Sequence, residues 1–139
     1  MKILISIVSL SISSASFAQA PTECFKMATK RERDGGLVVE GYNRGKALRL
    51  NKNEALILCR GTRTSEAPVA CTLMAQERKK LNGLNLNQAD GIRLCAGTDS
   101  MEATKDCFVK ATNSDRDGGL ELNDYDAIKL CRKYKGLNH

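Results

Sequence analysis

The chain of 139 residues is basic, with a formal net charge of +6 at neutral pH, and its length is that of a single domain. Only 4% of its residues are aromatic, which disfavours a surface that stacks nucleic-acid bases. A zinc site is also disfavoured, because no Cys-x-x-Cys occurs and the one His is the terminal His139.

The N-terminal segment, residues 1–18, is typical of a secretory signal peptide. Lys2 supplies a charged start, and an apolar run and a stretch of small residues follow it. The run is too short and too rich in Ser to span a membrane. We place cleavage at the end of this segment rather than after Ala20, because Pro21 would then follow the cut directly. Residues 19–139 are expected to form one exported domain, in the periplasm or outside the cell.

The exported part is a threefold repeat. Six Cys fall into three pairs, and the second and third pairs share an internal spacing of 24 residues and recur with a period of 36. The pairs are Cys24 with Cys59, Cys71 with Cys95, and Cys107 with Cys131. Because similar residues surround each pair, the chain is three copies of one small unit.

An even number of regularly spaced Cys in a short exported chain indicates a disulfide framework. Pairing within each copy uses every Cys and gives every copy the same bond, so we predict the three pairs named above. The rival arrangement joins neighbouring copies, through Cys59–Cys71 and Cys95–Cys107, and leaves the first and last Cys at opposite ends of the array.

Each copy predicts two helices joined by a Gly-containing turn. A helix-compatible stretch follows each first Cys, as in Cys71–Ala75, whose end residues share a helix face. A second helix begins at an Asn that is followed three residues later by an acidic residue, which is the pattern of a capping box. These pairs are Asn51 with Glu54, Asn87 with Asp90, and Asn123 with Asp126. Gly61 and Gly97 are placed to end the second helices.

An antiparallel hairpin of these helices would bring both Cys of a copy to the same open end. The predicted fold is therefore all-α: three disulfide-braced antiparallel helical hairpins, at about 22–61, 66–97 and 101–134, stacked as a short repeat array. Each disulfide should stabilise the fold by about 3–4 kcal/mol, which matters because a single hairpin buries little apolar surface.

The first copy differs from the others by an insertion of 11 residues, centred on residues 38–46, and by its charge. Residues 19–63 hold ten Lys or Arg against five Asp or Glu. The candidate anion-binding residues are Lys30, Arg31, Arg33, Arg44, Lys46 and Arg49. Such a patch favours a polyanionic glycan, a phospholipid headgroup or an acidic protein. The alternative is a solvated loop with no partner.

The turn of the third copy resembles an EF-hand calcium loop over residues 113–124. The resemblance implies calcium ligands at Asn113, Asp115, Asp117, Gly119, Glu121 and Asp124, with Gly119 acting through its carbonyl and Glu121 directly or through water. The loop departs from the family pattern in its Asn at the first position, its Gly at the seventh and its short Asp at the twelfth. The other copies hold Lys30, Lys79 and Leu81 at matching positions.

Catalytic chemistry is not indicated. The exported part has no internal His, its Cys are committed to disulfides, and its Ser are limited to Ser65, Ser100 and Ser114. Two carboxylates could still act as acid and base, but no pair is singled out. We expect a non-enzymatic exported protein that presents a helical-hairpin surface to a protein or polyanion. Weak calcium binding through the third turn is the alternative, and a purely structural envelope component is a third reading.

Overall fold

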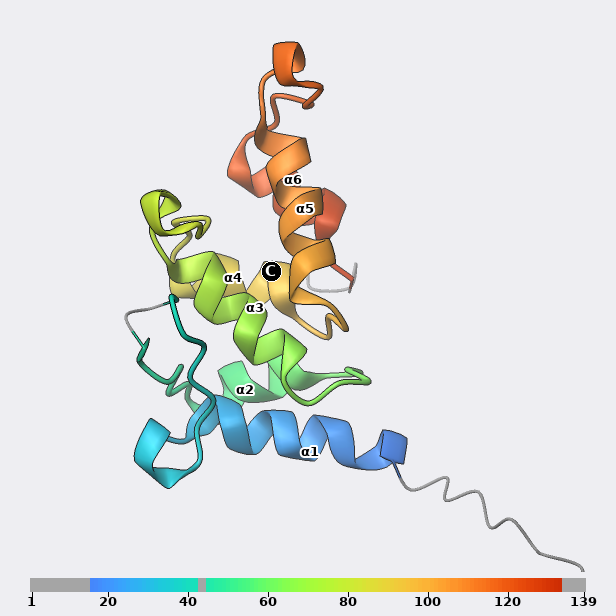
Figure 1. Ribbon diagram of the computed structural model, residues 1–139. Coiled ribbons are helices and arrows are strands. Elements are labelled where there is room, and N and C mark those ends of the chain that lie inside the picture. The colour runs from blue at the N-terminus through green and yellow to red at the C-terminus, as the bar shows by residue number, and fades with distance from the viewer. Residues whose placement is uncertain (1–15, 43–44, 134–139) are drawn as a thin grey trace, which may run out of the picture.

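The computed structural model describes residues 16–42 and 45–133, and this part of the chain contains six α-helices and no strand (Figure 1). The helices are α1 (Ser16–Thr29), α2 (Lys52–Cys59), α3 (Ala67–Gln76), α4 (Gln88–Cys95), α5 (Met101–Thr112) and α6 (Asp124–Cys131). Most of the predicted signal segment and the candidate residue Arg44 lie outside the described residues, so the signal segment stays a prediction.

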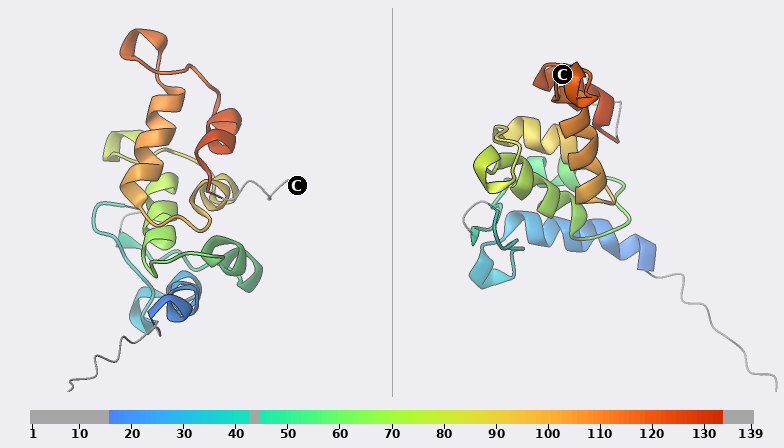
Figure 2. Two further views of the ribbon diagram at one scale, coloured as in Figure 1. Left: turned by 90° about the vertical axis from the view of Figure 1, so that its right-hand side faces the viewer. Right: turned by 45° about the horizontal axis from the view of Figure 1, so that its top comes forward.

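The helices pair into three hairpins that stack in chain order, as predicted. Hairpin 1 is α1 with α2, hairpin 2 is α3 with α4, and hairpin 3 is α5 with α6. The first helices form one column and the second helices a neighbouring one (Figures 1 and 2). The two junctions are built alike, because at each the first helices touch, the second helices touch, and the second helix of one hairpin touches the first helix of the next.

The disulfides confirm the predicted pairing within copies. Cys24–Cys59, Cys71–Cys95 and Cys107–Cys131 each have a Cα–Cα distance of 5.7 Å. Each bond joins the interior of a first helix to the last residue of a second helix. The rival pairing between copies is therefore excluded.

Helix α1 begins at Ser16, before the predicted start of hairpin 1 near residue 22, whereas α3 and α5 begin close to the predicted starts of their hairpins. In hairpin 2, α3 begins at Ala67, and Pro68 lies in its first turn, where a missing N–H removes no helical hydrogen bond. In hairpin 3, Ser100 caps α5 by accepting the backbone N–H of Ala103 at 3.1 Å. The first Cys of each copy thus lies inside its helix rather than at its start.

The second helices begin at the predicted caps. Asn51, Asn87 and Asn123 each accept a hydrogen bond from the backbone N–H three residues later. Only the first cap is a complete capping box, in which Glu54 also accepts the N–H of Asn51 at 3.0 Å. The Asp residues at the other two caps are one methylene shorter and instead accept the side-chain amide of their Asn. Gly61 and Gly97 are left-handed, as predicted for helix ends.

The turn between the helices has the same backbone path in all three copies. A single 3₁₀ turn is followed by a left-handed residue, which is Gly35, Asn82 or Gly118. The next residue is always Gly, because the returning chain runs against the start of the turn. At Gly119, for example, a Cβ would collide with the backbone of Asn113.

Hairpin 2 supplies most of the fully buried side chains, since hairpins 1 and 3 cover it from both sides. Leu73, Met74 and Leu94 are completely inaccessible to solvent. The insertion of hairpin 1 is anchored to this core by Val39 and Tyr42, which are partly buried against it. Val39 and Tyr42 therefore hold the described part of the insertion against the core.

Candidate functional site

The fold brings the turn of hairpin 1 next to the end of the insertion. The guanidinium of Arg49 lies 3.3 Å from both carboxylate oxygens of Glu32, so the segments around residues 31–35 and 46–49 are neighbours. The predicted anion-binding residues other than Arg44 come from these two segments, and all of them are exposed. We call the described ones, Lys30, Arg31, Arg33, Lys46 and Arg49, the basic cluster.

Two acidic residues offset part of the charge of the basic cluster. A hydrogen bond from its own backbone N–H and the nearby Arg49 guanidinium hold the pKa of the Glu32 carboxyl below its ordinary value. Glu32 is therefore ionised at neutral pH and faces Arg49, while Asp34 lies 3.8 Å from the Arg33 guanidinium. The remaining cations of the cluster form no ion pair with another described residue, and their charge faces solvent.

The third turn brings the calcium-like residues into a network of internal hydrogen bonds. Glu121 accepts the backbone N–H of Asp115 at 3.1 Å, and Ser114 donates to Asp117 at 2.7 Å. Within residues 16–42 and 45–133, no three His, Cys, Asp or Glu residues are grouped so that they could hold a metal ion. Because the second copy forms the same turn from Lys79–Leu81, this backbone path does not require calcium. The calcium hypothesis rests on the sequence resemblance.

Of the three Ser residues of the exported part, two form hydrogen bonds that stabilise the fold and the third lines a depression in the surface. Ser100 caps α5 and Ser114 binds Asp117 within the third turn. Ser65 lines a shallow depression of about 460 Å³ together with Glu23 and Glu66.

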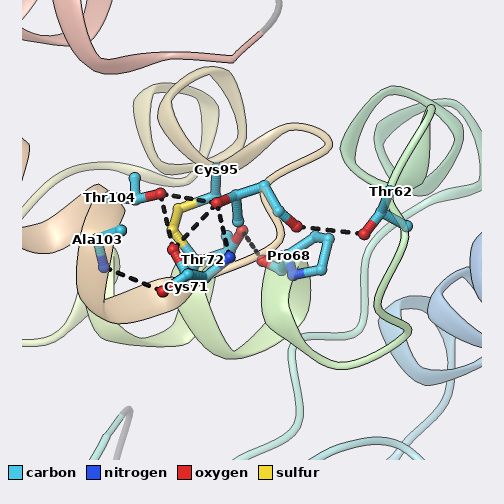
Figure 3. The surroundings of a disulfide bond; sticks show 9 residues. Thr62, Pro68, Cys71, Thr72, Cys95, Ala103 and Thr104 are labelled. Carbon is cyan, nitrogen blue, oxygen red and sulfur yellow. Dashed lines mark hydrogen bonds between the residues drawn. A yellow bond between two sulfur atoms is a disulfide. The ribbon is translucent and has the colours of Figure 1, made fainter.

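A polar seam between hairpins was missed by the sequence reasoning. The hydroxyl of Thr62 lies 2.6 Å from the backbone carbonyl of Thr64 and 3.2 Å from that of Thr98, so its one proton is shared between its own segment and hairpin 2, beside the Cys71–Cys95 disulfide (Figure 3). Asp99 accepts the backbone N–H of Arg63 at 2.8 Å and the ammonium of Lys133 at 2.7 Å. The signal was present in the sequence, because Thr62 and Thr98 hold the same position in successive copies.

Asp99 has a perturbed acidity. Partial burial acts to raise its pKa, but hydrogen bonds from Lys133 and from the backbone of Arg63 outweigh burial and lower the pKa below the ordinary value. The charged form of Asp99 is therefore the form that the folded array stabilises.

An apolar groove of about 710 Å³ on hairpin 1 was also missed. It runs between α1 and α2, and its walls include Pro21, Phe25, Leu56 and Ile57, with Arg60 at its edge. Leu56 is 61% exposed, although the sequence pattern grouped it with the apolar positions of its helix. The apolar walls of the groove distinguish it from the charged surface of the basic cluster.

The chain matches no known family model, no curated protein and no solved structure. Its described helices include none with the length and apolar character needed to cross a membrane. The three disulfides fit an oxidising environment.

Proposed function

We propose that this protein is an exported, non-enzymatic binding protein whose basic cluster holds a polyanionic partner. The observation that carries the proposal is the joining of the turn of hairpin 1 and the end of the insertion into one exposed, mainly positive surface. Neither segment alone would present as many cations to a single partner.

Export is supported by the start of α1 as well as by the disulfides. Pro21 lies inside α1 in the full chain, where its missing N–H would cost a helical hydrogen bond. Its equivalent in the second copy, Pro68, lies in the first turn of α3. Cleavage after residue 18 would place Pro21 in the first turn as well, where Pro is well tolerated.

The cluster suits a polyanion rather than a single small anion. Its cations lie on flexible, exposed side chains, and none is fixed in a closed cavity among the described residues. Each exposed ion pair between the cluster and its partner would contribute little binding free energy. Useful affinity therefore requires several ion pairs that form at once with a repeating anionic chain. The Arg49–Glu32 ion pair and the hydrogen bond that the backbone N–H of Leu50 donates to the carbonyl of Ala28 at 2.7 Å hold the two segments side by side before binding, which reduces the entropy lost on association. Such binding weakens as salt rises.

Retention on immobilised heparin tests the proposal. The variant Lys30→Ser/Arg31→Ser/Lys46→Ser should elute at lower salt than the wild type. The matched control is Arg78→Ser/Lys79→Ser/Lys80→Ser, which removes the same charge from the turn of hairpin 2. Because both variants change exposed residues only, their thermal stability should stay close to that of the wild type. Equal loss of retention in the two variants would show that net charge, not the basic cluster, governs binding.

A further inference from the structure

The N-terminal end of the array has an uncovered apolar face. Leu56 of α2 is 61% exposed, whereas the residues in the same position of the next two copies, Ile92 and Ile128, are only 5% and 4% exposed. The difference lies in the neighbours, because hairpins 2 and 3 each stack on a preceding hairpin and hairpin 1 does not.

The first helix of hairpin 1 shows the same pattern. Phe25 is only partly buried, whereas the equivalent residues Thr72 and Phe108 are almost completely buried. Phe25 and Leu56 both line the 710 Å³ groove. The groove is therefore the surface that a preceding hairpin covers elsewhere in the array.

The C-terminal end of the array also has an uncovered apolar face, because no hairpin of the described chain follows hairpin 3. Leu120 and Leu130 of hairpin 3 are 60% and 54% exposed. Their equivalents in the first two copies, Leu48 and Leu84 for the former and Leu58 and Leu94 for the latter, are all buried. Terminal repeats of such arrays usually carry a polar outer face that keeps them soluble, and here both ends carry Leu instead.

One polar contact between hairpins 1 and 2 has a counterpart at a contact between two molecules. Between hairpins 1 and 2, Gln88 donates to Glu54 at 2.8 Å. If hairpin 3 of one molecule stacked on hairpin 1 of another, the position of Glu54 would be held by Asp126 and that of Gln88 by Lys52. These two exposed residues have opposite charges, so the contact gains an ion pair where the internal junction has a neutral donor.

We propose that a second copy of this chain docks head to tail, with hairpin 3 of one molecule stacked on hairpin 1 of the next. The docked surfaces are the ones that already meet at both internal junctions. Because such a contact is heterologous, each added molecule leaves a free face at both ends, and the array can continue. The proposal does not depend on the basic cluster.

Sedimentation velocity of the exported, disulfide-bonded protein tests the docking, with its N-terminus defined by mass spectrometry. The wild type should form species larger than a monomer in a concentration-dependent way. Leu56→Asp damages the N-terminal face and Leu130→Asp damages the C-terminal face, so each variant alone should stay monomeric. An equal mixture of the two should form a dimer and nothing larger, because one intact face of each kind remains. Leu81→Asp, at an exposed Leu on the turn of hairpin 2, is the control and should assemble like the wild type.

Several results would overturn the proposal. A wild type that is monomeric up to about 1 mM would show that the end faces do not bind each other. Self-association of Leu130→Asp alone would show that two N-terminal faces pair, and a monomeric mixture would exclude the head-to-tail contact. A charge exchange gives a second readout: Lys52→Glu and Asp126→Lys should each weaken assembly, and the two changes together in one chain should restore it.

Discussion

Asp99 accepts a hydrogen bond at 2.8 Å from the backbone N–H of Arg63, the residue that holds the same position one copy earlier. Its other oxygen accepts from Lys133, which follows the last helix of hairpin 3. One carboxylate therefore connects the segments that leave all three hairpins. Since the hairpins share no disulfide with one another, such contacts and apolar packing are what hold the array together.

Replacement of Asp99 should separate its two contacts. Asp99→Ala loses both, and we expect the free energy of unfolding to fall by about 1–2 kcal/mol. Asp99→Asn keeps an oxygen for the N–H of Arg63 and loses only the partly exposed ion pair with Lys133, so the loss should be below about 1 kcal/mol. Urea denaturation measures both variants. Equal losses would mean that the Arg63 contact contributes nothing.

The lowered pKa of Asp99 predicts a loss of stability in acid. A carboxyl whose pKa is lower in the folded state stabilises the protein above its unfolded pKa, and this stabilisation disappears as the pH falls through the folded pKa. The difference in the free energy of unfolding between the wild type and Asp99→Asn should therefore be largest near neutral pH. It should shrink in acid, where Asp99 becomes uncharged. Urea denaturation over a pH series checks this, and a difference that grows in acid would contradict it.

The disulfides of hairpins 2 and 3 should differ in their contribution to stability although both close loops of the same sequence separation, 24 residues. Loop entropy predicts about 3–4 kcal/mol for each. Cys71 and Cys95 are completely buried, whereas Cys107 and Cys131 are only partly buried. Cys71→Ala/Cys95→Ala should therefore lose more than Cys107→Ala/Cys131→Ala in urea denaturation, because a cavity adds to the lost cross-link. The reverse order would show that burial does not control the difference.

Substitution should be costly at one of the two adjacent glycines of the third turn and tolerated at the other. Gly119→Ala forces a Cβ into the backbone of Asn113 and should cost more than about 2 kcal/mol. Gly118 is left-handed with open space around it, and Asn82 holds the same position in hairpin 2. Gly118→Asn should therefore change the free energy of unfolding by less than about 1 kcal/mol. Thermal unfolding compares the pair, and a tolerated Gly119→Ala would contradict the close backbone approach.

The calcium hypothesis predicts one weak site that depends on the third turn. The short Asp124 at the last ligand position favours a dissociation constant of about 10⁻⁴ to 10⁻³ M. Titration calorimetry should then show heat with the wild type and none with Asp117→Ala. Absence of heat and of a thermal shift at about 5 mM calcium, well above that range, would leave Asp115 and Asp117 as turn residues.

Local signals made the individual hairpin predictable. The Cys spacing indicated the disulfide pairing, and the Asn caps marked the start of each second helix, because both depend on residues close together in one copy. The starts of the first helices were less clear, since Ser100 and Pro68 lie before the apolar stretch that marks each helix.

The end faces and the seam could not be predicted in the same way. Repeat equivalence treats Leu56 and Ile92 as the same position, but their burial depends on whether another hairpin precedes them. Likewise, Asp99 differs in type from Arg63, and only the stacked structure shows that the two meet. Such features arise from contacts between copies, which the pattern within one copy does not describe.

The confinement of each disulfide to one hairpin also determines how the molecule would respond to tension. When the chain is pulled from its ends, each bridge passes the force across a Cα–Cα distance of 5.7 Å and shields the hairpin loop behind it. Between Cys24 and Cys131, only the two linkers that join neighbouring hairpins, residues 59–71 and 95–107, can lengthen, each to roughly 40 Å at full extension. Tension would thus pull the hairpins apart one junction at a time and leave three closed loops on a short tether, until a reductant opens the bridges.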